Sequence, residues 1–163
     1  MIPGYDCWAT AGDGDYFDPD AAEHAVAFFP TCLHHIKGPA AGKPYELSDW
    51  EQGVVGCLFG WKGPDGFRRY REAFVYVAKK NSKSTLCAGL CLYGLMQDGE
   101  MSAEVYSCAA SRDQAAIIFN TMVRMAKLEP ELDKRLTVYG AKGGSQQRSV
   151  MHEPTMSTYR PLA

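Results

Sequence analysis

The chain has 163 residues, of which 46% are apolar, 22% charged and 12% aromatic, and its formal net charge is −2. These values are typical of a folded domain, and they exclude a disordered, fibrous or strongly basic protein. The N-terminus has neither the basic region nor the apolar region of a signal peptide, and no apolar run of about 18 residues occurs. We therefore expect no export and no membrane partner.

The first elements in the chain are an irregular arm and a helix. Residues 1–18 are rich in Gly, Asp and Tyr and show no period, so we expect little regular structure there. Apolar residues then recur at helical spacing over Pro19–Ile36 and predict a helix that Asp18 or Asp20 caps. Pro30 should kink or divide this helix, because proline lacks the backbone N–H.

A second helix should follow the Gly/Pro/Lys loop at residues 37–44. Ser48 and Glu51 have the spacing of a capping box, in which each side chain bonds the backbone N–H of the other residue. The helix is therefore expected to begin at Ser48 and to run to about Trp61, before a turn at residues 62–66.

Strands are expected to alternate with helices in the second half of the chain. Residues 73–78 are β-branched and aromatic and predict a strand that is buried on both faces. After a polar loop, residues 86–96 are apolar all round, which predicts a buried helix that Asp98 and Gly99 end.

The pattern repeats to the end of the chain. Ser111 and Gln114 form a second capping box at the start of a helix. The further elements are a strand at 103–109, this helix at 111–127, a short helix at 130–135, a strand at 136–139, and one or two short strands at 150–162. Such alternation predicts an α/β fold with a parallel sheet and crossover helices.

The junction between the strand at 73–78 and the next helix has the layout of a phosphate-binding loop. A triphosphate needs backbone amides, a lysine, a hydroxyl for Mg²⁺ and a helix N-terminus, and Lys83 and Ser84 lie at such a place. Against the pattern G-x-x-x-x-G-K-[ST], however, Val77 and Ser82 replace the two glycines, which permit positive φ and close approach. The alternative is a solvated turn rich in lysine.

Two other features of the sequence bear on partners. The most basic stretch, from Arg68 to Lys83, is either a solvated face with one phosphate site or a DNA surface. The six cysteines form no CxxC pair and no spaced Cys/His set, so we expect buried free thiols in a reducing compartment.

Three motifs in order resemble the ATPase domain of phage terminase large subunits. Residues 72–84, Glu-Ala-Phe-Val-Tyr-Val-Ala-Lys-Lys-Asn-Ser-Lys-Ser, are similar to the strand and phosphate loop of that family, where the loop usually reads Arg-Lys-Asn-Gly-Lys-Ser. Residues 109–115, Ala-Ala-Ser-Arg-Asp-Gln-Ala, resemble a run in which two alanines precede Gln-Ala. Residues 47–52 resemble the Trp-Gln pair on the adenine side. The similarity covers roughly residues 18–162.

The resemblance implies ATP and Mg²⁺ as cofactors and assigns roles to individual residues. Lys83 would bind the phosphates and act in catalysis, and Ser84 would be the metal ligand. Gln52 would contact the adenine edge with Trp50 packing nearby, although a purely structural role for Gln52 and a core role for Trp50 remain open. The expected ATP-binding residues are Trp50, Gln52, Lys79, Lys80, Asn81, Ser82, Lys83, Ser84 and Thr85.

Two arginines near the end of the chain are candidates for a catalytic role. Packaging motors place an arginine where it stabilises the transition state in a neighbouring subunit, and Arg148 and Arg160 lie in the tail. We assign this role to Arg160. Lys79 stands where many relatives have arginine, and its point charge does not replace a bidentate guanidinium.

The resemblance also implies the domain organisation. We expect an arm at 1–18 and, at 19–163, the N-terminal portion of an incomplete P-loop NTPase domain preceded by a helical segment. Relatives continue with an apolar strand ending in Asp-Glu and with a nuclease domain, and neither is found in the sequence. We therefore expect an ATPase, a phosphoanhydride hydrolase, in the full-length protein and no turnover by this portion alone.

The implied role is to power the packaging of viral DNA in the bacterial host cytoplasm. The expected partners are double-stranded viral DNA, a terminase small subunit, a portal protein and further copies of the full-length chain. Two alternatives are a non-catalytic binding or assembly module and a helicase-like NTPase remnant with a degenerate phosphate loop.

Overall fold

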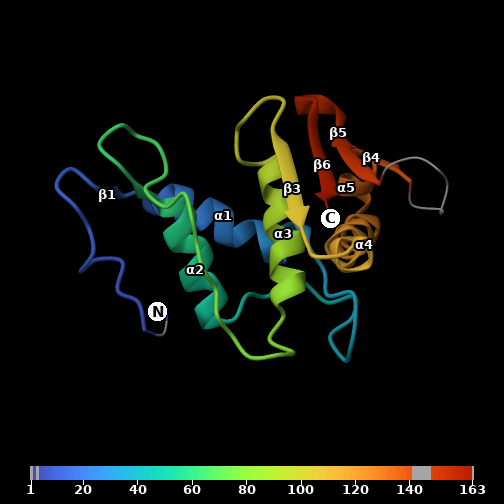
Figure 1. Ribbon diagram of the computed structural model, residues 1–163, viewed down its shortest axis with the longest axis horizontal. Coiled ribbons are helices and arrows are strands. Elements are labelled where there is room, and N and C mark those ends of the chain that lie inside the picture. Colours follow the sequence, from blue (N-terminus) through green and yellow to red (C-terminus); the bar gives the residue numbers. More distant parts are fainter. Residues whose placement is uncertain (1, 3, 141–147, 163) are drawn as a thin grey trace. The chain divides into compact units, whose positions relative to one another are not determined.

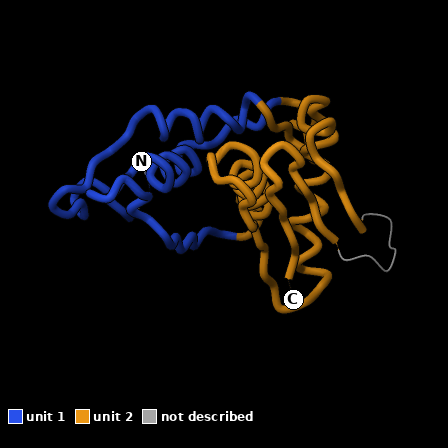
Figure 2. The backbone as a smooth tube through the Cα atoms, turned by 90° about the horizontal axis from the view of Figure 1, so that it is seen from above, with its two compact units in different colours: residues 1–31, 44–78 blue, residues 32–43, 79–163 orange. Residues whose placement is uncertain are grey.

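The computed structural model describes residues 2, 4–140 and 148–162. The chain forms two compact units, and each is built from two separate stretches (Figure 2). Unit 1 comprises residues 1–31 and 44–78, and unit 2 comprises residues 32–43 and 79–163. No helix within the described residues is long and apolar enough to cross a membrane.

Unit 1 is built on two helices, α1 (Pro19–Cys32) and α2 (Asp49–Gly60). Two short strands, β1 (Tyr16–Phe17) and β2 (Trp61–Lys62), precede α1 and follow α2, and they pair antiparallel. The fully buried side chains of this unit include Phe29, Tyr45, Val55 and Trp61. Burial of such large apolar and aromatic groups is the main stabilising contribution to a unit of this size.

The first helix begins as predicted and ends earlier than predicted. Asp18 caps it, because its Oδ1 accepts a hydrogen bond of 3.0 Å from the Ala21 amide. Pro30 lies inside α1 and does not divide it, and the helix ends at Cys32 and not at Ile36. A proline within the last turn removes only one backbone donor, and few helical bonds follow it.

The predicted capping box at the start of α2 is confirmed. Glu51 is buried at 3% exposure, and its Oε2 accepts hydrogen bonds from the Ser48 amide at 2.9 Å and from the Ser48 hydroxyl at 2.7 Å. The Tyr45 hydroxyl donates to Oε1 at 2.9 Å. Three donors therefore offset the cost of burying this carboxylate.

Gly60 ends α2 where the backbone approaches β1 and α1 closely. A Cβ atom at this position would lie 2.6 Å from the Phe17 ring and 2.8 Å from the Ala22 side chain. Only glycine fits this contact without a shift of its neighbours.

Unit 2 combines helices with a four-stranded sheet of order β3-β6-β5-β4 (Figure 1). Its elements, in chain order, are α3 (Lys83–Met96), β3 (Glu104–Cys108), α4 (Arg112–Leu128), α5 (Pro130–Asp133), β4 (Leu136–Tyr139), β5 (Ser149–His152), the 3₁₀ turn η1 (Glu153–Thr155) and β6 (Ser157–Leu162). The predicted helices and strands between residues 86 and 162 are thus confirmed to within a few residues at their ends.

The sheet is mixed, so the prediction of a parallel sheet is wrong for most of it. Only β3 and β6 pair parallel, whereas β4–β5 and β5–β6 pair antiparallel. A parallel pairing needs a crossover of about a dozen residues or more. Between β5 and β6 the chain has only η1 and Met156, whose φ of 57° makes a tight reversal, so β6 returns beside β5.

Helices α3 and α4 pack against each other and against strands β3 and β6. The buried face of α4 includes Phe119, whose ring stacks on Tyr159 of β6 with centroids 6.4 Å apart. On α3 the apolar face is buried through Leu86, Leu92 and Leu95. This packing fixes the orientation of α3, and with it the position of the loop from which α3 emerges.

The predicted strand at residues 73–78 is wrong. The structure forms no strand there, and the rings of Phe74 and Tyr76 are 92% and 91% exposed. The two rings stack on each other with centroids 6.4 Å apart. A β-type sequence becomes a strand only when a neighbouring strand takes up its backbone hydrogen bonds.

Candidate functional site

The candidate site is the loop that leads into α3. Residues 79–82 form a turn and a bend, and α3 begins at Lys83, three residues before the predicted start at Leu86. The Ser82 carbonyl accepts hydrogen bonds of 2.9 Å from the amides of both Thr85 and Leu86, which closes the first helical turn. The first turn of a helix presents backbone donors and the positive end of the helix dipole, which favour an anion.

Ser82 has the backbone conformation that glycine normally supplies. It is the N-cap of α3 with φ 48° and ψ 9°, in the left-handed region, and its side chain makes no capping hydrogen bond. Lys80 in the same loop also has a positive φ, of 72°. A left-handed residue with a side chain costs about 1–2 kcal/mol. The loop therefore has the left-handed backbone conformation that glycine favours, although serine and not glycine occupies position 82.

The polar side chains of the loop are accessible. Lys79, Lys80 and Asn81 are exposed, as are Ser82 and Ser84, whereas Lys83 and Thr85 are half-buried. Ser84 and Thr85 place two hydroxyl groups in the first turn of α3. A half-buried lysine beside exposed hydroxyls at a helix N-terminus is a donor set that fits a phosphate group and its bound Mg²⁺.

The loop faces the same way as the carboxyl ends of the two parallel strands of unit 2. Figure 1 shows α3 running opposite to β3, so its N-terminus points in the direction in which β3 and β6 end. The N-terminus of α4 follows β3 and is capped by Ser111, whose Oγ accepts from the Gln114 amide at 3.3 Å. In α/β proteins this edge of the sheet is where ligands bind.

Arg160 lies on β6, opposite Tyr106 of β3 in the parallel pair, and it is exposed. The role of Arg160 toward a neighbouring subunit stays a prediction.

The two adenine-side candidates belong to unit 1, whereas the loop belongs to unit 2. Trp50 is half-buried in the first turn of α2. Gln52 is exposed, and its Nε2 donates to the Leu47 carbonyl at 2.8 Å, which fixes the side chain against the chain that precedes the helix. Their contact with adenine stays a prediction.

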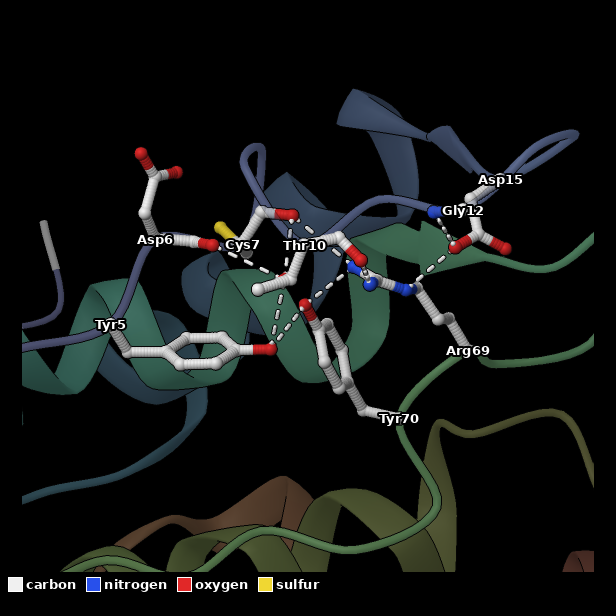
Figure 3. Close-up of polar contacts among 8 residues, drawn as sticks. All are labelled: Tyr5, Asp6, Cys7, Thr10, Gly12, Asp15, Arg69 and Tyr70. Atoms are coloured by element: carbon white, nitrogen blue, oxygen red, sulfur yellow. Dashed lines mark hydrogen bonds and ion pairs between the residues drawn. The ribbon is translucent and has the colours of Figure 1, made fainter.

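The arginines of the basic stretch interact inside unit 1. Arg69 forms an ion pair of 2.7 Å with Asp15 (Figure 3), and its guanidinium lies 5.2 Å from the Trp61 ring centre. Arg68 lies 5.4 Å from the centre of the Phe59 ring. Arg69 therefore serves the packing of unit 1 and not a continuous basic surface, a role that a linear run of charges does not reveal.

All six cysteines are free thiols, as predicted. The prediction that they are buried is wrong. Cys87 and Cys108 are exposed, and the other four are half-buried. Burial, and secondarily the neighbouring Cys87, raises the pKa of Cys91 to about 12. Among the residues that the structure describes, no three His, Cys, Asp or Glu side chains lie close enough to hold a metal ion.

Comparisons with known proteins agree on one family. The family model for the terminase large subunit, ATPase domain, matches residues 49–149. The large terminase subunit of Enterobacteria phage HK97 is 31% identical over 113 residues, which cover 69% of this chain and 21% of that protein.

The same relative is matched in three dimensions. The crystal structure of the HK97 bacteriophage large terminase aligns with a TM-score of 0.73 at 25% identity, over 87% of this chain and 27% of that one. The chain thus spans about a fifth of the length of the curated relative and about a quarter of the solved structure.

Proposed function

Because the chain belongs to the family of terminase large-subunit ATPase domains, we propose that it is the ATP-binding portion of a large subunit that powers the packaging of viral DNA into procapsids. The observation that carries the proposal is the start of α3, where a left-handed Ser82 is followed directly by Lys83 and Ser84. A left-handed residue followed by a lysine and a hydroxyl group at a helix N-terminus supports a phosphate loop of the P-loop NTPase type.

In this proposal the loop holds the triphosphate of ATP. The Lys83 ammonium contacts the β- and γ-phosphates, and the amides at the start of α3 donate to phosphate oxygens. Lys79, Lys80 and Asn81 surround the phosphates and add positive charge and one amide group. The half-buried position of Lys83 strengthens its attraction to the phosphates, because fewer water molecules screen its charge.

The Ser84 hydroxyl, with Thr85 beside it, is the protein group that fits Mg²⁺. Magnesium keeps several water molecules and takes few protein ligands, so one exposed hydroxyl next to the phosphates suffices. When bound, the ion neutralises charge that develops on the phosphate oxygens. Trp50 and Gln52 bind the adenine, and Arg160 stabilises the transition state in a neighbouring copy.

The role of the whole protein is proposed on the same basis. Double-stranded viral DNA, a terminase small subunit and a portal protein are the partners, and the full-length chain acts as an oligomeric motor in the cytoplasm of the bacterial host. The net charge of the chain is −2, so the overall charge does not attract DNA. DNA contacts therefore come from local positive charge.

Titration with a fluorescent ATP analogue tests the proposal. Replacing Lys83 by alanine removes a charged hydrogen bond to phosphate, and we expect the affinity to fall about ten- to hundredfold. Lys127→Ala is the matched control, because Lys127 is an exposed lysine in the last turn of α4, away from the loop in sequence.

The control should bind the analogue as the unmodified chain does. If Lys83→Ala and the unmodified chain bind equally, or if neither binds at millimolar analogue, the loop does not hold nucleotide. The chain would then be a binding or assembly module.

A further inference from the structure

The N-terminal arm is held onto the body of unit 1 by Arg69. The Arg69 guanidinium donates to the Cys7 carbonyl at 3.2 Å and to the Thr10 carbonyl, and it forms the ion pair with Asp15 (Figure 3). Its side chain and that of Asp15 are only 15% and 14% exposed, so water screens this pair weakly. Three contacts from one side chain thus fix residues 7–15.

A second contact of the arm joins two thiols. The Sγ atoms of Cys7 and Cys57 lie 2.9 Å apart, although the residues are 50 positions apart in the chain. This is roughly 0.9 Å more than the ~2.05 Å of a disulfide bond, a difference that small side-chain rotations close. Both residues are half-buried and not enclosed in the core.

The pair is distinguished from the other cysteines of the chain. All six cysteines lie within the described residues, and no second pair of their sulfurs is within hydrogen-bonding distance. Cys57 is on α2, whose first turn is fixed by the capping box, and Cys7 is on the arm that Arg69 holds. The two sulfurs therefore meet because two independent sets of contacts position them.

From this geometry we infer that Cys7 and Cys57 are a redox modification site, at which a disulfide-type oxidant such as oxidised glutathione converts the two thiols into a disulfide that locks the arm onto α2.

The exchange proceeds in two balanced steps. The Cys7 thiolate attacks one sulfur of oxidised glutathione, so a mixed disulfide forms and one glutathione thiolate leaves. The Cys57 thiolate then attacks the Cys7 sulfur, and the second glutathione leaves. The protein loses two protons and two electrons, and the oxidant takes them up as two molecules of glutathione.

The order of attack follows from the surroundings of Cys57. Burial, followed by the contact with Cys7, raises the pKa of Cys57 to about 12, which disfavours this residue as the first attacking thiolate. Once Cys7 carries glutathione, its sulfur is electrophilic and lies beside Cys57, so the second step is intramolecular.

Peptide mapping of the full 163-residue chain under native conditions tests the site. The chain is incubated with oxidised glutathione, blocked with iodoacetamide and cleaved before aspartate without reduction. Residues 6–12 then carry Cys7, residues 49–64 carry Cys57 and residues 20–48 carry Cys32, each as the one cysteine of its fragment. We expect fragments 6–12 and 49–64 to be linked, with the loss of two hydrogen atoms.

The Cys7–Cys57 disulfide should also raise the midpoint temperature of thermal unfolding. A disulfide across about 50 residues restricts the unfolded chain, and for a domain of this size we expect an increase of about 6–12 °C that dithiothreitol reverses. Cys57→Ser should abolish both the link and the increase, whereas Cys32→Ser should keep both. Arg69→Gln should form the link several times more slowly, because the arm is no longer held.

Three results would overturn the inference. They are unlinked fragments after oxidation, a link that appears only in urea, and glutathione that stays on Cys7 without transfer to Cys57.

Discussion

At the scale of single residues, the conformation of Ser82 links stability to function. Its φ of 48° is unfavourable for a residue with a Cβ, and in the proposed phosphate loop the same Cβ would limit how closely a phosphate approaches the backbone. We predict that Ser82→Gly stabilises the chain by about 0.5–1 kcal/mol, after the entropic cost of glycine, and binds the ATP analogue about fivefold more tightly.

Ser102 provides the matched control for this substitution. It is an exposed serine with φ 57° in the turn before β3, and it is not part of the candidate site. Urea unfolding should show a similar gain for Ser102→Gly, whereas analogue titration should show no change in affinity. A gain in affinity for both variants, or for neither, would show that the backbone conformation at position 82 does not limit nucleotide binding.

At the scale of elements, the end of α2 depends on a glycine contact. A Cβ at Gly60 would lie 2.6 Å from the Phe17 ring, so Gly60→Ala must displace β1 or α1. Overpacking of this kind costs about 1–3 kcal/mol. We predict this loss in the free energy of unfolding, measured by urea denaturation.

Gly56→Ala, on the same helix, should raise the free energy of unfolding, whereas Gly60→Ala should lower it. Its added Cβ would meet only the Val26 side chain, at 3.9 Å, and alanine favours a helix interior over glycine by up to about 1 kcal/mol. Equal effects of the two substitutions would show that helix propensity, and not the contact with β1 and α1, decides the stability of this region.

Local signals in the sequence predicted most elements and the start of the candidate site. The capping box at Ser48, the caps at Asp18 and Ser111 and the start of α3 near Lys83 all depend on residues within four positions of one another. Such short-range chemistry can be derived without knowledge of the rest of the fold.

Features that depend on distant partners could not be predicted in this way. The direction of β6 is set by its short connection to β5, and residues 73–78 form no strand although their composition favours one. The contact of Arg69 with Asp15 and that of Cys7 with Cys57 join residues that are far apart in the chain. The sequence shows the residue types of these pairs, but only the fold brings them together.

At the scale of the whole molecule, a buried histidine ties stability to pH. His152 is 4% exposed, its Nδ1 lies 2.7 Å from the Thr155 hydroxyl, and its buried Nε2 has no hydrogen-bond partner among the described residues. Burial, with a smaller effect of Arg135, lowers the pKa of His152 below its ordinary value of 6.5. The folded chain therefore favours the neutral imidazole.

The sign of the pH dependence follows from this shift. Above pH 6.5 the histidine is neutral in both states, and its contribution to stability is complete. As the pH falls below 6.5, the unfolded chain binds a proton that the folded chain disfavours, so the free energy of unfolding should decrease. Urea unfolding between pH 7.5 and 5.5 measures this slope.

His152→Gln should show a shallower slope over this range than the unmodified chain. A steep slope that survives in His152→Gln would assign the pH dependence to other groups.

The division of each unit into two stretches has a consequence for synthesis on the ribosome. The chain passes between the units three times, at residues 31–32, 43–44 and 78–79. Unit 1 has all of its residues once residue 78 has emerged, but residues 32–43 must wait for the later part of unit 2. The N-terminal unit is thus able to fold first, while it carries a short loop whose own partners have not yet been translated.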